Sequence, residues 1–422
     1  MDIREKINEK IMEYRIKKAR ERLHKKRLHK NGRRMTREER AREVRKKKIM
    51  AGGALLAVVL LIILAVSLGG KDKETKLASA NNTAKSSKEE GKSSIDSENS
   101  GDRKEGEAQQ ENQDKEGPED VSVTISATGD CTLGTDEFFD WSTSLPAKYD
   151  ETGDFGYFFR NVKPIFEADD LTIINFEGTL TNSDDRQDKQ FAFKADPSFA
   201  KIVTEGAVEA ANLANNHSKD YGEQSYTDTI DNLEAEGITT FGYDRTAVMD
   251  VKGVKVGLLG TYVLAEGIEV KDSMIANINA LKEQGADLII ASFHWGNEKE
   301  YQPDEVQKEL AHAAVDNGAD LVIGHHPHVL QGIEVYNGKN ILYSMGNFCF
   351  GGNSAPSDMN TMIFQQTFTF KDGKLSEDNV TNVIPCSISS ADGYNNYQPT
   401  PAEGELKDDI LGKIEEYSSW IN

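Results

Sequence analysis

Residues 318–336 read GADLVIGHHPHVLQGIEVY, and this stretch indicates the fold more clearly than any other part of the chain. Its apolar run LVI predicts a buried strand, which the glycine and histidines after it bring to an end. We expect His326 and His328 to share one side of an extended segment, because Pro327 disfavours a helical His326 and side chains two apart in a strand share a face. Three histidines in four residues at a strand end favour metal or phosphate chemistry over a structural role.

The alternation of strand and helix signals continues on both sides of this stretch. Strands are predicted at residues 121–128, 171–175, 207–213, 254–260, 287–293, 320–323 and 340–344, and helices at about 156–168, 197–205, 222–236, 274–284 and 303–317. Strands separated by helices of this length predict crossover connections and a largely parallel sheet. After residue 330 strand signals dominate, so we expect a second sheet portion, mixed or antiparallel. The fold class is α/β.

Polar residues with metal-binding chemistry stand at the ends of the predicted strands. In open α/β sheets, ligands collect at the carboxyl ends of parallel strands. Each motif alone has an ordinary structural explanation, such as a turn or a satisfied core histidine. Their repetition at five consecutive strand ends predicts one metal site, built from Asp130, Asn175, Glu177, Asn216, His217, His294, His326 and His328.

Charge divides the chain into unlike segments, although the formal net charge of the whole is −21. Residues 1–48 carry 21 basic and 8 acidic side chains, residues 49–70 carry none, and residues 121–422 carry 20 basic and 49 acidic ones. The acidic body excludes nucleic acid as the expected partner, since phosphate backbones require clustered lysine and arginine.

The neutral segment 49–70 contains the unbroken apolar run ALLAVVLLIILAV at residues 54–66. As a helix its 22 residues span roughly 33 Å, about one bilayer core. The basic tail before it predicts a cytoplasmic N-terminus and an extracellular C-terminal domain. We interpret the segment as an uncleaved, single-pass signal anchor in the cell membrane, because the preceding tail is too long for a signal peptide.

The remaining boundaries follow from composition. Residues 1–48 form a basic cytoplasmic tail, and residues 71–120, rich in Lys, Glu, Ser and Asn, are expected to be a disordered linker. One α/β domain covers 121–390, and 391–422 form a polar C-terminal extension. Sequence leaves open whether Cys349 and Cys386 form a disulfide.

The motifs GDCTLG (129–134), NFEGTLT (175–181), ANNHSKDYG (214–222), HWGNEKEY (294–301) and YSMGNFCF (343–350), with the opening stretch, are in the order typical of one family. Over residues 121–390 the chain resembles the CapA family of capsule and poly-γ-glutamate synthesis proteins. That family is similar to a branch of the calcineurin-like metallophosphoesterases, so the resemblance implies a two-sheet α/β/β/α sandwich.

Residue by residue, the resemblance implies a metal site with a neighbouring acid. Asp130 would be the first-strand ligand, and Glu177, with Asn175, would occupy the place of a bridging aspartate. Asn216 would bind metal or phosphate, and His217 would be the general acid. The imidazole ligands would be His294, His326 and His328.

The sequence departs from the phosphoesterase pattern at the first strand. Cys131 and Thr132 follow Asp130 where that pattern has Asp-x-His, and threonine is a poorer ligand than histidine. A single ion or an altered pair is therefore expected in place of a standard two-metal clamp. Mixed nitrogen and oxygen ligands suit Mn, Zn or Fe.

Three functions are compatible with these features. The first is a membrane-anchored, extracytoplasmic component of capsule or poly-γ-glutamate synthesis and export. It would work with the membrane, with other subunits of a polymer synthase or export complex and with an anionic polymer. The second is a metal-dependent hydrolase of phosphoesters or of an amide-linked polymer, and the third is a non-catalytic scaffold.

Overall fold

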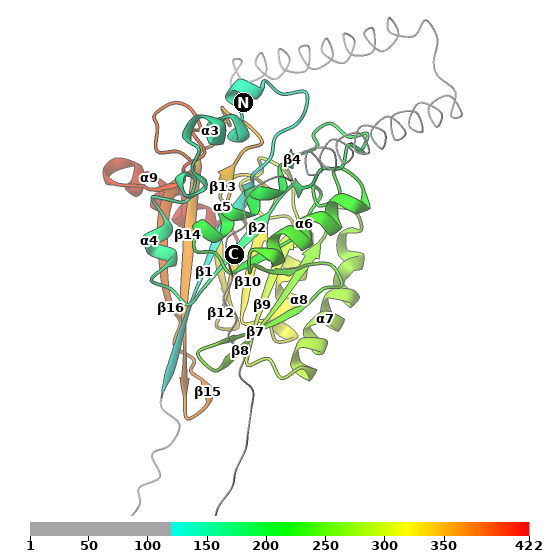
Figure 1. The fold of residues 1–422 in the computed structure, drawn as a ribbon. Helices are drawn as coiled ribbons and strands as arrows, with labels where there is room; N and C mark the ends of the chain where they lie inside the picture. The colour runs from blue at the N-terminus through cyan, green and yellow to red at the C-terminus, as the bar shows by residue number, and fades with distance from the viewer. Residues whose placement is uncertain (1–119, 422) are drawn as a thin grey trace, which may run out of the picture. The chain divides into compact units, whose positions relative to one another are not determined.

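Residues 120–421 are described by the structure, a computed structural model, and they form an α/β fold with two large sheets (Figure 1). The first sheet has nine strands in the order β17-β16-β14-β1-β2-β5-β6, with β13 beside β1 and β15 beside β14. These strands are β1 (Val121–Thr132), β2 (Leu171–Phe176), β5 (Ala210–Asn212), β6 (Thr239–Phe241), β13 (Asn347–Phe350), β14 (Asn360–Lys371), β15 (Lys374–Leu375), β16 (Val380–Ser387) and β17 (Thr400–Pro401).

The second sheet has six strands in the order β11-β12-β10-β9-β8-β7. They are β7 (Ala247–Val251), β8 (Val254–Tyr262), β9 (Leu288–His294), β10 (Leu321–His325), β11 (Ile333–Tyr336) and β12 (Lys339–Leu342). In the first sheet β1, β2, β5 and β6 are parallel, whereas β14, β16 and β17 continue the sheet on the other side of β1 as antiparallel strands. In the second sheet the four strands β12, β10, β9 and β8 are parallel, and the edge strands β11 and β7 are antiparallel to their neighbours. A separate pair joins β3 (Thr179–Leu180) to β4 (Lys194–Ala195).

Helices connect and cover the strands. The α-helices are α3 (Leu145–Thr152), α4 (Lys163–Phe166), α5 (Ala200–Glu205), α6 (Glu223–Ala235), α7 (Lys271–Glu283), α8 (Glu305–Asp316) and α9 (Gly404–Ser419). Short 3-10 turns are η1 (Trp141–Thr143), η2 (Phe155–Tyr157), η3 (Pro197–Phe199) and η4 (Gly267–Val270). The start of α8 is explained by its capping residue. Asp304 caps α8 through a capping box with Gln307, which satisfies two otherwise unpaired backbone N–H donors.

Three buried clusters show that the layers are stacked as helices, sheet, sheet, helices. The central cluster joins the facing sides of the two sheets, for example Ile125 and Ile173 against Leu258 and Ile290. Alternate residues of the first sheet pack outward against α5 and α6, and those of the second pack against α7 and α8. Because strand side chains alternate between faces, each sheet buries both sides. The predicted α/β/β/α arrangement therefore agrees with the packing of the described residues.

The predicted strands correspond to β1, β2, β5, β8, β9, β10 and β12, with shifts of a few residues at their ends. The helix expected over 156–168 is instead divided into η2 and α4. Lys163 and Pro164 begin α4, and the proline ring cannot continue a preceding helix, so the break has a local cause.

The segment 391–422 contains α9, which sequence periodicity did not predict. Ile410, Ile414 and Tyr417 of α9 join the cluster between the sheets, and the helix contacts β11 of one sheet and β16 of the other. The helix thus covers the space between the two sheets at one side.

Two other expectations concern the cysteines and the membrane anchor. All three cysteines are buried and free, so Cys349 and Cys386 do not form a disulfide. None of the helices between residues 120 and 421 has both the length and the apolar character that a bilayer crossing needs. The predicted tail, anchor and most of the predicted linker lie outside the described residues.

Replacing Ile290 by Ala is expected to destabilise the protein by about 2–5 kcal/mol, because it leaves a cavity between the two sheets. Ile290 is fully buried, whereas Val335 on β11 is 61% exposed. The matched change Val335→Ala should alter the free energy of unfolding by less than about 0.5 kcal/mol. Urea unfolding followed by circular dichroism measures both, and equal effects would contradict the assigned core.

Candidate metal centre

The carboxyl ends of five parallel strands, three from the first sheet (β1, β2 and β5) and two from the second (β9 and β10), bring the candidate residues together. Asp130 pairs with Asn175 across β1 and β2, and with Asn347 across β1 and β13. In the second sheet, His294 of β9 pairs with His325 of β10. The backbone N–H of Asp130 donates to the carbonyl of Gly346 at 2.9 Å. Asp130 lies within β1, because that strand extends further than the predicted 121–128, and Asn175 lies within β2, as predicted.

Asp130 is a fully buried carboxylate that accepts from several donors. Asn175 Nδ2 donates to Oδ1 at 2.7 Å, and the backbone N–H of His326 donates to Oδ2 at 3.2 Å. His325 Nδ1 lies 3.4 Å from Oδ1, and His328 Nδ1 lies 3.3 Å from Oδ2. Burial alone would raise the pKa of Asp130, but the bonds from His325 and His328 hold it well below its usual value. Asp130 is therefore the fixed negative charge of the centre.

Glu177 follows β2 and is also fully buried, but one of its oxygens has no hydrogen-bond partner. That atom, Oε1, lies 3.7 Å from His294 Nε2 and 3.9 Å from Nε2 of both His217 and His328. The other oxygen accepts a long hydrogen bond of 3.4 Å from Thr132 Oγ1. Burial raises the pKa of Glu177 to about 8. A free carboxylate oxygen that faces three imidazoles is arranged to bind a cation.

The histidines after β10 lie in a bend, so the prediction of an extended His326 is wrong. The strand ends at His325, and His326 and His328 have φ angles of +98° and +57°. Non-glycine residues rarely adopt such angles, and where they do the conformation is often functional. The bend still brings His326 and His328 together with Glu177, so that one ligand atom from each lies within 4.8 Å of the others.

His328 differs from the other histidines of the centre in its charge. Burial would lower its pKa, but the carboxylates of Glu177 and Asp130 outweigh burial and raise the pKa to about 10. Asn347 Oδ1 accepts a 2.8 Å bond from His328 Nδ1 in that charged form. A cation bound at Glu177 would therefore replace the positive charge of His328.

His294 and Asn216 are placed side by side, as the sequence predicts. His294 Nε2 lies 2.8 Å from Asn216 Oδ1, and its Nδ1 lies 3.3 Å from Asn175 Nδ2. Burial and the neighbouring His326 lower the pKa of His294 well below its usual value, which keeps the ring neutral. A neutral imidazole is the form that binds metals.

His217 stands beside Glu177 and is oriented by Asp220. His217 Nδ1 lies 2.7 Å from Asp220 Oδ2, and Lys189 Nζ lies 2.6 Å from Asp220 Oδ1. Lys189 also donates to the carbonyl of Asn216 at 2.7 Å. The backbone N–H of Phe193 donates to Asp220 as well, at 2.5 Å. Burial lowers the pKa of His217, and the Asp220 carboxylate opposes that shift. Because Asp220 binds Nδ1 of His217, the other ring nitrogen, Nε2, points toward Glu177.

The residues present fit a divalent cation. Buried side-chain polar atoms almost always have a partner, yet Glu177 Oε1 and His326 Nδ1 make no hydrogen bond within residues 120–421. Two unpaired atoms of metal-ligating type, on residues that the bend after β10 brings together, are explained by a partner that accepts their lone pairs. Glu177, His326 and His328 are the residues best placed to hold it, with Asp130, His294 and Asn216 beside them.

Sequence reasoning missed several contributors to the centre. His325 is the clearest, because only its neighbours were expected to be ligands, although its position at the strand end was visible. Asp220 orients His217 from three residues further along the motif ANNHSKDYG, where its position was visible, whereas Lys189 binds Asp220 from a distant loop and no local pattern links the two. Asn347 was visible only as part of the motif YSMGNFCF.

The two-sheet sandwich with buried carboxylates and histidines at one edge defines an α/β protein with a candidate divalent-metal centre. The chain belongs to the family described as "Bacterial capsule synthesis protein PGA_cap", which matches residues 124–352, and this confirms the resemblance to CapA proteins. The matched residues include every side chain of the predicted site.

Similar proteins occur in several bacteria. "PGA biosynthesis protein CapA" of Bacillus subtilis is 35% identical over 214 residues, covering 46% of this chain and 56% of that protein. "Capsule biosynthesis protein CapA" of Bacillus anthracis is 34% identical over 220 residues, covering 46% and 54%. A "probable polyglutamine synthesis accessory protein" of Mycobacterium tuberculosis is 30% identical over 211 residues, covering 43% and 55%. The chain thus spans about half the length of each of these relatives.

Adding Mn²⁺, Zn²⁺ or Fe²⁺ is expected to raise the unfolding temperature, because a ligand that binds only the folded state adds about 2.7 kcal/mol of stability at a hundred times its dissociation constant. His326→Ala should abolish the shift for the ion that binds. The control His312→Ala removes a partly exposed histidine on α8, outside the centre, and should preserve it. Differential scanning calorimetry with and without a chelator measures these shifts. Equal shifts in His326→Ala and wild type would contradict the assignment.

Proposed function

We propose that this protein is a membrane-anchored, extracytoplasmic component of capsule or poly-γ-glutamate synthesis and export, with a divalent metal bound at the edge shared by its two sheets. The single observation that carries the proposal is the family match over residues 124–352, which contains the whole centre. The names of the relatives from the two Bacillus species support poly-γ-glutamate or capsule polymer as the product that the machinery makes.

The proposed topology rests on the sequence before the described residues. The basic tail at 1–48 and the uncharged segment 49–70 support a single-pass anchor with the N-terminus in the cytoplasm. Segment 71–120 would then connect the anchor to the domain as a flexible spacer of roughly 40 Å. Other subunits of a synthase or export complex would assemble with the protein at the membrane.

The negative charge of the domain suggests a role for a metal ion at the centre. Residues 121–422 carry 49 acidic and 20 basic side chains, so the domain repels an anionic polymer at long range. A bound divalent ion would supply local positive charge and Lewis acidity beside the buried carboxylates of Asp130 and Glu177. The residues of this chain that would hold it are Glu177, His326 and His328.

A specific observation also favours a second candidate, a metal-dependent hydrolase of phosphoesters or of an amide-linked polymer. Asp220 binds one ring nitrogen of His217 and leaves the other directed toward Glu177. Lys189 and the backbone N–H of Phe193 hold the carboxylate of Asp220 in place. In this arrangement His217 can deliver a proton to a leaving group at the centre.

Replacing Glu177 by Gln is expected to reduce surface polymer strongly in the bacterium that encodes this protein, because the change removes the charge of a central ligand while keeping its shape. The matched control Glu305→Gln changes a side chain that is 92% exposed and should leave polymer at the wild-type level. Immunoblotting confirms that each variant is present, and polymer is measured after release from the cells. Unchanged polymer in a deletion strain would refute the proposed function.

For the hydrolase, His217→Ala is expected to lower kcat by about 10²–10⁴, the usual contribution of a general acid. Asp220→Asn should lower it too, because the carboxylate that orients the ring is lost. The full-length chain is assayed with Mn²⁺ or Zn²⁺ on a phosphomonoester, a phosphodiester and a γ-glutamyl peptide. Turnover no higher than that of His326→Ala with every substrate and ion would exclude the hydrolase.

A further inference from the structure

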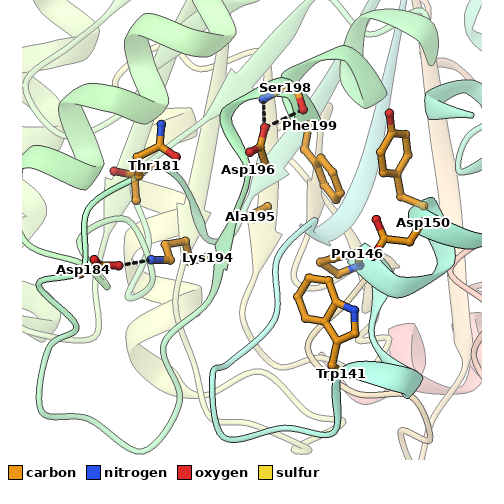
Figure 2. A pocket seen from close by; sticks show the side chains of 12 residues that line it. Trp141, Pro146, Asp150, Thr181, Asp184, Lys194, Ala195, Asp196, Ser198 and Phe199 are labelled. Carbon is orange, nitrogen blue, oxygen red and sulfur yellow. Dashed lines mark hydrogen bonds and ion pairs between the residues drawn. The ribbon is translucent and has the colours of Figure 1, made fainter. Parts of the chain in front are cut away.

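A cavity of about 560 Å³ lies between the segment of η1 and α3 and the segment of β3, β4 and η3 (Figure 2). Its volume falls within the range of small-molecule sites, roughly 300–1,000 Å³. None of the residues of the metal centre lines it. The residues that do are Trp141, Pro146, Tyr149, Asp150, Thr181, Asn182, Asp184, Lys194, Ala195, Asp196, Ser198 and Phe199.

One wall of the cavity is aromatic. The side chain of Trp141 is 55% exposed, which is unusual for a residue of its size and apolar area. Tyr149 and Phe199 pack edge to face with ring centroids 5.1 Å apart, so the wall behind the cavity is supported. Figure 2 shows Trp141 and Pro146 on one side of the cavity, with Lys194 and Asp184 on the other. The indole therefore offers a flat apolar face to whatever enters.

Polar side chains on both sides of the cavity offer hydrogen bonds to a ligand. The side chains of Asn182 and Asp150 make no hydrogen bond to any residue in the described part of the chain, so both are available. Asp196 uses Oδ1 to accept from Ser198, which leaves its other oxygen available. These groups supply both donors and acceptors, since an amide offers each and a carboxylate accepts.

The charge of the lining excludes a polyanion as the ligand. The cavity has three carboxylates, on Asp150, Asp184 and Asp196, against the single ammonium of Lys194. That ammonium is already engaged, because it donates to the Ser183 carbonyl at 2.8 Å and lies 3.2 Å from Asp184 Oδ1. A chain of glutamates would thus meet repulsion with no free cation to offset it.

We propose that this cavity binds the neutral pyranose rings of an oligosaccharide. A sugar ring has an apolar face of C–H groups, which suits the electron-rich face of Trp141, and a rim of hydroxyls, which suit the carboxylates and the amide of the lining. A ligand with both features and no charge matches a cavity that combines aromatic rings with acceptors of net negative charge. The site is separate from the metal centre but close to it, because Phe193, next to Lys194, has its ring 4.5 Å from that of His217.

Binding is tested with the full-length chain in a detergent that has no sugar headgroup. The probes are a tetramer of N-acetylglucosamine and a tetramer of glucose, with a γ-glutamate oligomer as the anionic comparison. Isothermal titration calorimetry should detect saturable binding of at least one neutral tetramer and none of the γ-glutamate oligomer. The two sugars distinguish an acetamido sugar from a plain hexose as the preferred ring.

Two variants locate the site. Trp141→Ala should weaken binding roughly tenfold, the equivalent of about 1.4 kcal/mol, whereas Trp141→Phe should retain most of it. Trp420→Ala is the matched control, because Trp420 is also partly exposed, at 37%, and lies outside the cavity. Asn182→Ala should weaken binding without altering the unfolding temperature.

Several outcomes would overturn the proposal: no saturable binding of either neutral tetramer, equal affinity in Trp141→Ala and wild type, or binding of the γ-glutamate oligomer that Trp141→Ala abolishes. The test is independent of the proposed function, because His326→Ala should bind the sugar normally. Loss of polymer synthesis in that variant with retained sugar binding would separate the two sites.

Discussion

The structure depends on two carboxylates that are buried where the parallel strands of both sheets end. Removing an ionised carboxylate from water is costly unless charges and hydrogen-bond donors compensate. Asp130 is compensated by Asn175 and by the histidines that follow β10. Glu177 is compensated only in part, since one oxygen has no partner. Asp130 is therefore fully hydrogen-bonded, whereas Glu177 keeps one oxygen without a partner. This combination is expected of a site that binds a cation.

This requirement explains the local conformation of the chain. The positive φ angles of His326 and His328 turn the backbone directly after β10, and the same turn directs the His326 N–H at Asp130. Asn175 in turn receives a bond from Asn212, so the first sheet supports the orientation of the amide that binds Asp130. Asp130 is thus held by a residue that is itself held, so the geometry around this carboxylate is set before any ion arrives.

Much of this arrangement could be predicted from sequence because its signals are local. Strands such as LVI and DLIIASF can be predicted from their apolar runs. Parallel strands place their carboxyl ends at one edge of the sheet, so Asp130, Glu177 and His294 could be assigned to one site from the sequence. The family resemblance, which the comparisons confirm, supplied the layers and the expected ligands. The contact of Lys189 with Asp220 could not be predicted, since it depends on how a loop of residues 181–193 folds back. The bend at His326 was missed because a residue before proline is normally extended. Helix α9 was missed because its sequence is mostly polar, and only three of its side chains reach the core.

Asp220 binds both a loop and a residue of the centre, so the rate of amide hydrogen exchange in that loop depends on the contacts of the centre. Its carboxylate binds Lys189 and the Phe193 N–H from that loop and His217 from the turn after β5. A second buried carboxylate, Asp136, accepts from Arg186 and from the Ala192 N–H of the same loop. If the loop opened, Asp136 and Asp220 would both lose hydrogen-bond donors at the same time. Surface loops usually exchange their amide hydrogens quickly, but the amides of Ala192 and Phe193 should exchange as slowly as those of a strand.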